Sequence, residues 1–115
     1  MTKVLLIEIQ ELGIDTRADN LRARGLDVTP SVRSVIPGRR FDSVIYVISS
    51  QNALRAPEEK YGEVIIEIRD AYPRAKVVVY SSHSVLDEYK KEINAARAIP
   101  LEMITTLDDM ARQLR

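Results

Sequence analysis

The amino-acid sequence predicts an α/β domain with a doubly wound, five-stranded parallel sheet and helices on both faces. Apolar runs rich in branched side chains recur along the chain, as is typical of strands that are covered on both sides. Segments with apolar residues at helical spacing separate most of these runs, and such crossovers between parallel strands are overwhelmingly right-handed. We therefore expect the strand order 2-1-3-4-5 in a single domain over residues 1–115.

Five apolar runs are the expected strands. They are KVLLIEI (3–9), LDVTPSV (26–32), FDSVIYVI (41–48), AKVVVY (75–80) and a weaker run at 99–104. The second run contains Pro30, which has no amide hydrogen to donate, so this strand is expected at an edge of the sheet. Residues 31–40 leave room for only a turn or two of helix before Pro37 and Gly38. The second crossover should therefore be unusually short.

Four segments with helical periodicity are the expected helices. They are 11–24, 57–72, 84–97 and a last helix that starts at Thr106. Their apolar positions are Ile14, Ala18 and Leu21; Tyr61, Val64, Ile65, Ile68, Ala71 and Tyr72; Val85, Leu86, Tyr89, Ile93 and Ala96; and Leu107, Met110, Ala111 and Leu114. In the first helix this pattern leaves Arg17 for solvent. Ser84 with Asp87, and Thr106 with Asp109, resemble the capping arrangement that opens a helix.

Composition and charge limit the functions that the chain can have. Seventeen Lys and Arg balance seventeen Asp and Glu, so no global field favours nucleic acid or an anionic membrane. The chain has no cysteine, which excludes disulfides, thiolate nucleophiles and Cys-based metal sites. The N-terminal apolar run is too short for a signal-peptide core or a membrane span, so we expect a cytoplasmic protein. The four glycines form neither a dinucleotide fingerprint nor a P-loop, and we expect no cofactor.

The residues that follow each apolar run are the candidate ligand-binding residues, because ligands of such sheets bind outside the carboxyl ends of the strands. They are Glu8, Ser49, Ser50, Ser81, Ser82, His83 and Thr105. This edge is polar but nearly uncharged, and it offers hydroxyl groups rather than carboxylates.

Neither a catalytic residue nor a metal site is expected. Ser82 and His83 are adjacent in sequence, an arrangement that rarely gives triad geometry, and no orienting acid is evident. A solvated loop histidine and an anion cradle at the start of the following helix are the other interpretations. Asp108 and Asp109 are adjacent at a helix start, where capping explains them better than metal binding does.

A local basic loop interrupts the otherwise balanced charge. Arg33, Arg39 and Arg40 lie in the stretch 28–41, which contains no acidic residue. These arginines could contact an acidic partner or a phosphate group; the alternative is that they are solvated side chains around a tight turn. The stretch has no stacking pattern for nucleic acid.

The order and rhythm of the strands resemble those of response-regulator receiver domains, which have a flavodoxin-like fold. FDSVIYVISS looks like the third strand of that family, and the alignment puts Val47, or a residue beside it, where the family has its phosphoacceptor aspartate. Glu8 keeps one member of the acidic pair that ends the first strand of the family, and Ile9 stands where the second acid belongs. Ser81 or Ser82 keeps the family's hydroxyl, and Thr105 stands where its lysine belongs.

The resemblance therefore implies a degenerate receiver. Magnesium prefers several oxygen ligands, and Glu8 is the one carboxylate among the matched positions. Valine cannot form an acyl phosphate, so the family's usual phosphorylation chemistry is not expected. The family also uses a partner surface built by its fourth helix, fifth strand and fifth helix, and the resemblance implies that this surface could also join two copies of the chain as a homodimer. The matching positions here are Tyr89, Ile93, Ile104, Thr105, Met110 and Leu114.

Three functional hypotheses follow. The first is a phosphorylation-independent interaction module that binds a protein partner in signalling or regulation. The second is a sensor that binds a small ligand or an anion at the polar carboxyl edge, since fold does not determine function. The third, a hydrolase-type enzyme, ranks last because the sequence shows no credible nucleophile, metal set or cofactor loop.

Overall fold

The computed structural model describes residues 1–8, 13–32, 35–49 and 60–115. The strands are β1 (Lys3–Glu8), β2 (Asp27–Val32), β3 (Ser43–Ile48), β4 (Lys76–Ser81) and β5 (Ile99–Glu102). The helices are α1 (Ile14–Arg22), α3 (Tyr61–Ala71), α4 (His83–Glu88), α5 (Lys90–Ala95) and α6 (Leu107–Leu114). No helix within the described ranges is both long and apolar enough to cross a bilayer.

The sheet has the predicted strands in the predicted order. All five are parallel and lie in the order β2-β1-β3-β4-β5. Pro30 lies in the edge strand β2, as predicted. An edge strand has a neighbouring strand on one side only, so a residue without an amide hydrogen is tolerated there. Near the carboxyl ends, the register aligns Glu8 with Val47, Val47 with Tyr80, and Tyr80 with Leu101. These residues form one row across the sheet.

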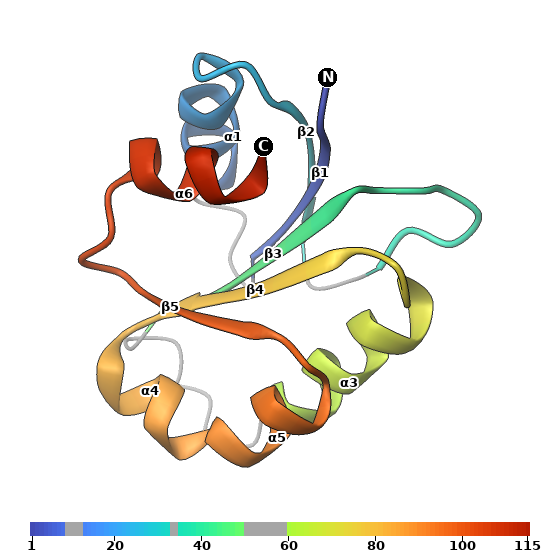
Figure 1. The fold of residues 1–115 in the computed structure, drawn as a ribbon, viewed down its shortest axis with the longest axis vertical. Helices are drawn as coiled ribbons and strands as arrows, with labels where there is room; N and C mark the ends of the chain where they lie inside the picture. The colour runs from blue at the N-terminus through green and yellow to red at the C-terminus, as the bar shows by residue number, and fades with distance from the viewer. Residues whose placement is uncertain (9–12, 33–34, 50–59) are drawn as a thin grey trace.

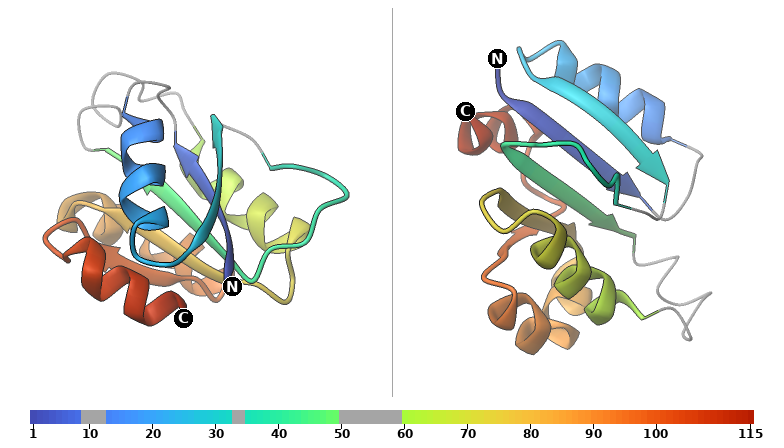
Figure 2. Two further views of the ribbon diagram at one scale, coloured as in Figure 1. Left: turned by 90° about the horizontal axis from the view of Figure 1, so that it is seen from above. Right: turned by 90° about the vertical axis from the view of Figure 1, so that its right-hand side faces the viewer.

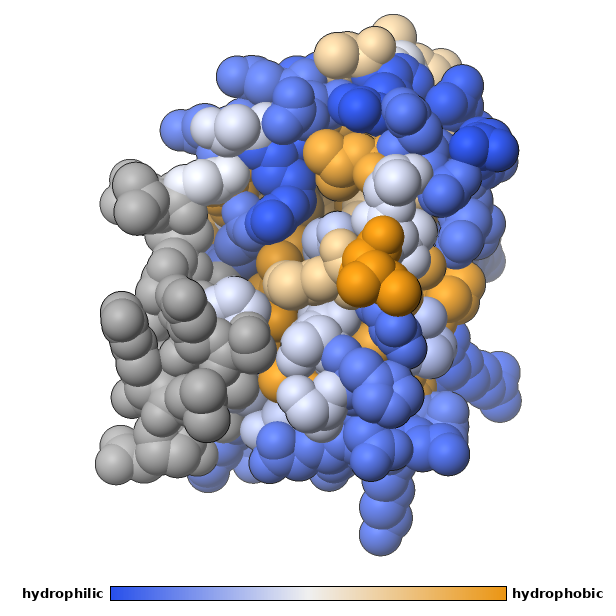
Figure 3. Space-filling view, turned by 90° about the vertical axis from the view of Figure 1, so that its left-hand side faces the viewer, coloured by the Kyte–Doolittle hydropathy of each residue, from blue (hydrophilic) through white to orange (hydrophobic). Residues whose placement is uncertain are grey.

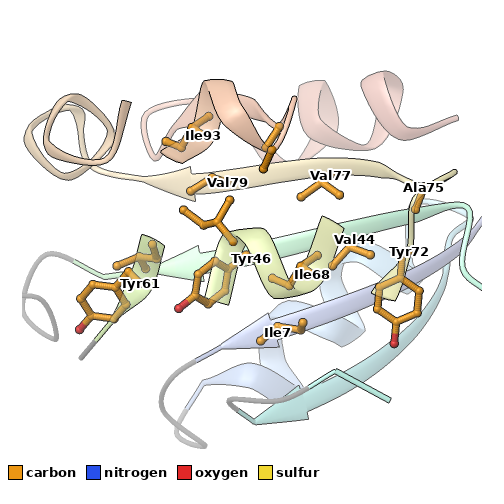
Figure 4. Packing of buried hydrophobic residues seen from close by; sticks show 14 of the residues in the cluster. Ile7, Val44, Tyr46, Tyr61, Ile68, Tyr72, Ala75, Val77, Val79 and Ile93 are labelled. Atoms are coloured by element: carbon orange, nitrogen blue, oxygen red, sulfur yellow. The ribbon is translucent and has the colours of Figure 1, made fainter. Parts of the chain in front are cut away.

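Helices cover both faces of the sheet, α1 and α6 on one face and α3, α4 and α5 on the other (Figure 1, Figure 2). Successive side chains of a strand point to opposite faces. Val4 and Leu6 of β1 therefore lie in the core under α1 and α6, and Leu5 and Ile7 lie in the core under the other helices. Figure 4 shows this second core, where Ile68 of α3 lies among side chains of the strands.

The crossover between β2 and β3 is short, as predicted, and its described residues 35–42 contain no helix. Tyr72, directly after α3, fixes this connection. Its hydroxyl accepts a hydrogen bond from the N–H of Ile36 and donates one to the carbonyl of the same residue, each at 2.8 Å. Its ring also meets Phe41 edge-on, with 5.6 Å between the centroids. The connection is thus held by a side chain instead of by helical packing.

Arg69 of α3 joins separate parts of the chain on the same face of the sheet. Its guanidinium donates to the carbonyl of Ala75, just before β4, at 2.9 Å. It also donates to the carbonyls of Ala96 and Arg97, after α5, at 2.6 Å and 3.2 Å. One side chain therefore satisfies carbonyls at the start of β4 and at the end of α5.

The helix predicted over 84–97 is wrong in its start and in its continuity. β4 extends to Ser81 and α4 begins at His83, so Ser82 is the N-cap residue and Ser84 lies inside the first turn. The helix is then broken at Tyr89, which has φ −101° and ψ 18° and separates α4 from α5. The Tyr89 ring packs edge-on against Tyr61 of α3, at 5.6 Å between centroids. This tertiary contact coincides with the break.

The C-terminal elements follow the sequence more closely. Thr106 caps α6 as predicted, because its Oγ1 accepts a hydrogen bond from the N–H of Asp109 at 3.2 Å. The fifth strand ends at Glu102, earlier than expected, since the N–H of Thr105 turns back to the Glu102 carbonyl at 2.9 Å. Ile104 therefore lies in a turn and not in a strand.

Candidate functional site

A buried ion pair lies at the carboxyl end of β1. Glu8 is the last residue of the strand and only 7% exposed. Its Oε1 contacts the guanidinium of Arg17, which projects from α1 and lies over the ring of Tyr80, 5.8 Å from the centroid. The charge of the acid is therefore compensated inside the protein, on the face covered by α1.

Within the described part of the sheet, the residues in the same row as Glu8 carry no second carboxylate. Val47 of β3 and Tyr80 of β4 occupy the same row as Glu8. The Tyr80 hydroxyl donates to the carbonyls of Met103 and Thr105, at 3.1 Å and 3.2 Å. Tyr80 therefore lies between the ion pair and the connection from β5 to α6: its ring contacts Arg17, and its hydroxyl bonds to that connection.

The electrostatics of the pair reflect its burial. Burial lowers the pKa of the Arg17 guanidinium from its ordinary value, and the interaction with Tyr80 opposes this shift. The second carboxylate oxygen of Glu8, Oε2, is buried and has no hydrogen-bond partner among the described residues. A buried carboxylate with one unsatisfied oxygen depends strongly on its single counterion.

The serines at and after the end of β4 do not form one polar site. Ser81 is fully buried, and its hydroxyl donates to the carbonyl of Ile48 at the end of β3. Ser82 is half-buried, and its Oγ lies 3.3 Å from the Oγ of Ser84. Ser81 therefore links two strands and presents no hydroxyl to solvent.

His83 belongs to a different part of the surface. Its side chain is 81% exposed, and its Nδ1 lies 2.9 Å from Oε1 of Glu102 at the end of β5. Both residues line an open hollow of about 280 Å³ together with Leu86 and Pro100. This hollow lies between α4 and β5, away from the Arg17 and Glu8 pair.

The remaining candidate ligand-binding residues are only partly placed. Ser49 follows β3 and is half-buried, whereas Ser50 lies outside the described residues, as does Ile9, which stands where the receiver family has its second acid. Thr105 is half-buried in the turn after β5. The expected polar edge is therefore divided between the ion-pair row and the His83 side, and no three described His, Asp or Glu residues group as a metal site requires.

Much of the expected partner surface is buried in the structure. Ile93 is 1% exposed, and Met110 and Leu114 are likewise in the core, because they are the positions by which α5 and α6 pack on the sheet. Their side chains cannot contact a partner in this fold. Tyr89 is half-buried against Tyr61, and Ile104 is 87% exposed. Ile104 is thus the apolar side chain of the set that remains accessible.

The helical periodicity assigns Arg17 to solvent, and this is wrong, because its side chain is only 29% exposed and reaches Glu8. Arg17 lies beside Ala18 at the border of the apolar face, where a long side chain can extend over the core. The feature of the sequence that could have indicated this contact is Glu8 itself. An acid that ends an otherwise apolar buried run requires a nearby cation.

Solved structures share this fold over almost the whole chain. A CheY-like response-regulator receiver domain protein from Methanospirillum hungatei JF-1 matches with a TM-score of 0.76 at 14% identity, covering 98% of this chain and 90% of that one. A response regulator from Burkholderia pseudomallei, solved with a phosphorylated aspartic acid, matches with a TM-score of 0.70 at 17% identity, covering 100% and 67%. An adenylate cyclase from Rhodopirellula baltica matches with a TM-score of 0.72 at 17% identity, covering 98% and 84%.

The chain therefore has the flavodoxin-like fold of receiver domains, with strand order 2-1-3-4-5. The sequence matches no protein-family model and no curated protein. At these identities the structural likeness shows the fold, and any role must be argued from the residues.

Proposed function

We propose that this chain is a receiver-like regulatory domain that binds a protein partner and works without phosphorylation at the end of β3. The fold supports a signalling or regulatory role, since its structural matches include response regulators and their receiver domains. Phosphorylation independence and partner binding rest on the residues of this chain.

The observation that carries the proposal is the buried pair of Glu8 and Arg17 beside Val47. An acyl phosphate requires a carboxylate, and β3 offers none at this row. A divalent cation would need several oxygen ligands, whereas the guanidinium of Arg17 already neutralises Glu8. The contact between Arg17 and Glu8 thus supports a site that does not bind a divalent cation.

The accessible apolar surface supports partner binding. Figure 3 shows the side of the molecule toward which the connection between β5 and α6 projects, where apolar residues gather with hydrophilic ones above and below them. Ile104 lies in this connection and is 87% exposed. An isoleucine in this position costs nothing to desolvate and suits a protein interface.

Phosphorylation independence is tested by incubation with acetyl phosphate and Mg²⁺, followed by intact-mass measurement without acid treatment. We expect no gain in mass, because no carboxylate is available at the end of β3. A phosphoryl group found within residues 43–49 would contradict the proposal. A receiver domain with its phosphoacceptor aspartate, treated in parallel, provides the positive control.

Partner binding is tested with Ile104→Asp. Immobilised protein should retain its partner from a lysate of its source cells, and the variant should lose that retention by about tenfold or more, as for a central interface residue. Val32→Asp is the matched control, since Val32 is 40% exposed but lies on the edge strand β2. Equal retention of the partner by the two variants would show that Ile104 is not part of the interface. Light scattering on the same proteins tests whether the partner is a second copy.

The alternative, a ligand sensor at the carboxyl edge, has less support. Ser81 is buried and bonded to Ile48, and the remaining polar side chains are divided between separate places. Thermal-shift measurement with nucleotides and sugar phosphates on the variant His83→Ala would test whether this edge binds a ligand. An increase in melting temperature that the variant abolishes would favour the sensor.

A further inference from the structure

The amino end of the sheet carries a hollow that the proposed function does not use. It has a volume of about 730 Å³ and lies where the start of β1, the connection between β2 and β3, and the turn between α3 and β4 meet. In Figure 1 the last two segments lie on the right, at the opposite end of β3 and β4 from the connection between β5 and α6. Its size is within the range of small-molecule sites, about 300–1,000 Å³.

Positive charge dominates the described lining of this hollow. Lys3, Arg39, Arg40 and Arg74 line it, with Asp42 as the one carboxylate. Four cations less one carboxylate leave a surplus of three positive charges, in a chain whose net charge is +0. Asp42 is also engaged, since its Oδ2 accepts a hydrogen bond from the backbone N–H of Lys3 at 2.8 Å. The three arginines come from two segments that are far apart in the sequence.

These arginines differ from others on the surface. Arg24 and Arg112 each contact an aspartate, at 2.6 Å and 2.5 Å. Within the described part of the chain, no ion pair joins Arg39, Arg40 or Arg74 to an acid. Arg39, Arg40 and Arg74 line the same hollow without an ion pair of their own, so an anion bound in it would be attracted by three positive charges that no described carboxylate already neutralises.

The wall of the hollow is fixed by aromatic side chains. Arg39 lies over the ring of Phe41, with its guanidinium carbon 5.4 Å from the centroid. A guanidinium in this position keeps its N–H groups in its own plane, free to donate to an oxyanion. Phe41 in turn packs edge-on against Tyr72, whose hydroxyl holds Ile36. The described segment 36–41 is thus anchored beneath Arg39.

We infer that this hollow binds a small phosphate-bearing anion, at the opposite end of the sheet from the Glu8 and Arg17 pair. Guanidinium groups match the oxygens of phosphate in geometry and charge, and several together suit a group with more than one negative charge. The concave shape favours a compact ligand. Phe41 and Tyr72 are buried, so the hollow has no exposed aromatic platform of the kind that binds single-stranded nucleic acid.

Calorimetric titration of the whole chain with pyrophosphate, at low and at moderate salt, tests this inference. We expect saturable binding that weakens as salt rises, and about tenfold weaker binding in each of Arg39→Gln and Arg74→Gln. Arg112→Gln is the matched control, because it removes the same charge from an exposed helical position and should leave the affinity unchanged. Asp42→Asn should tighten binding severalfold, since it removes the one negative charge and keeps a carbonyl oxygen for the N–H of Lys3.

The outcomes distinguish the possible ligands. Tighter binding of a nucleoside diphosphate than of pyrophosphate indicates an organic ligand, and equal binding indicates that phosphate alone is recognised; both support the site. Absence of saturable pyrophosphate binding would overturn it, as would equal weakening by Arg112→Gln. Binding of RNA or of anionic vesicles without binding of pyrophosphate would also overturn it, in favour of a macromolecular surface. Circular dichroism of each variant shows that a lost affinity does not come from unfolding.

Discussion

At the scale of single residues, Arg17 determines whether the acid at the end of β1 can remain buried. Glu8 is 7% exposed, and Oε2 of its carboxylate is unsatisfied by the described residues. A buried carboxylate is tolerated when a cation compensates it, and the main cost appears when that cation is removed. The ion pair therefore stabilises this edge of the sheet, and it is also the feature that supports the proposed phosphorylation-independent role.

Replacement of Arg17 by Met should destabilise the chain by about 2–4 kcal/mol, because it leaves the buried carboxylate of Glu8 unpaired. The double variant Glu8→Gln with Arg17→Met should recover most of that loss, since an amide is far less costly to bury than a charge. Urea unfolding followed by circular dichroism measures both free energies. A double variant as unstable as the single one would contradict this account.

An exposed ion pair provides the control. Arg112 contacts Asp109 on α6, with side chains 71% and 50% exposed. Arg112→Met should change the free energy of unfolding by less than about 1 kcal/mol, as is usual for surface pairs. The contrast between the two positions isolates the effect of burial.

The sequence predicts one half of this pair and not the other. Glu8 is evident as an acid at the end of an apolar run, and its register is set by strand alternation. Arg17 is missed, because the placement of α1 over the sheet depends on the packing of Ile14, Ala18 and Leu21, which periodicity alone does not convert into a distance. A partner contributed by another element is invisible to local patterns.

At the scale of helices and strands, the two helices for which the sequence predicts a hydroxyl cap differ in how they begin. Thr106 at the start of α6 accepts a hydrogen bond from the N–H of Asp109. Ser82 occupies the same N-cap position of α4 but makes no side-chain cap hydrogen bond. The first hydroxyl satisfies an otherwise unbonded helical N–H, and the second does not.

Thr106→Ala should therefore cost about 1 kcal/mol of the free energy of unfolding, the usual value of a lost N-cap. Ser82→Ala should cost clearly less, because no cap hydrogen bond is lost. Chemical denaturation of the two variants under one set of conditions gives the comparison. If Ser82→Ala proves the more damaging, the capping assignment is incorrect.

The strands are the most predictable elements, because a buried parallel strand leaves a dense apolar run such as that of β3. The helix after β4 is the least predictable. Its periodicity continues through Tyr89, and the break there coincides with a contact to Tyr61, a residue that is distant in sequence. The cap at Ser84 is wrong for a related reason, since the length of β4 places the helix start at His83.

At the scale of the whole molecule, the doubly wound parallel sheet follows from the alternation of elements and the handedness of their crossovers, and both are available from sequence. The contacts that hold α3, α4 and α5 together on one face of the sheet cannot be read from the sequence. Arg69 supplies part of it by donating to carbonyls before β4 and after α5. These carbonyls belong to connections, where no regular hydrogen-bond ladder exists to satisfy them.

Arg69→Lys should destabilise the chain by about 2 kcal/mol, because a single ammonium group cannot reach all the carbonyls that the guanidinium fork satisfies. Hydrogen exchange should show faster exchange both at the start of β4 and at the turn after α5. Arg112→Lys should leave exchange in both regions unchanged. Acceleration limited to one of the two regions would show that Arg69 does not couple them.

The hydroxyl of Tyr80 has a consequence for recognition. It bonds to the carbonyls of Met103 and Thr105, the two residues that flank Ile104. The most exposed aliphatic side chain of the turn is therefore carried on a backbone that the sheet already immobilises. A partner that covers Ile104 meets a preorganised protrusion, so that little conformational entropy remains to be lost when the complex forms.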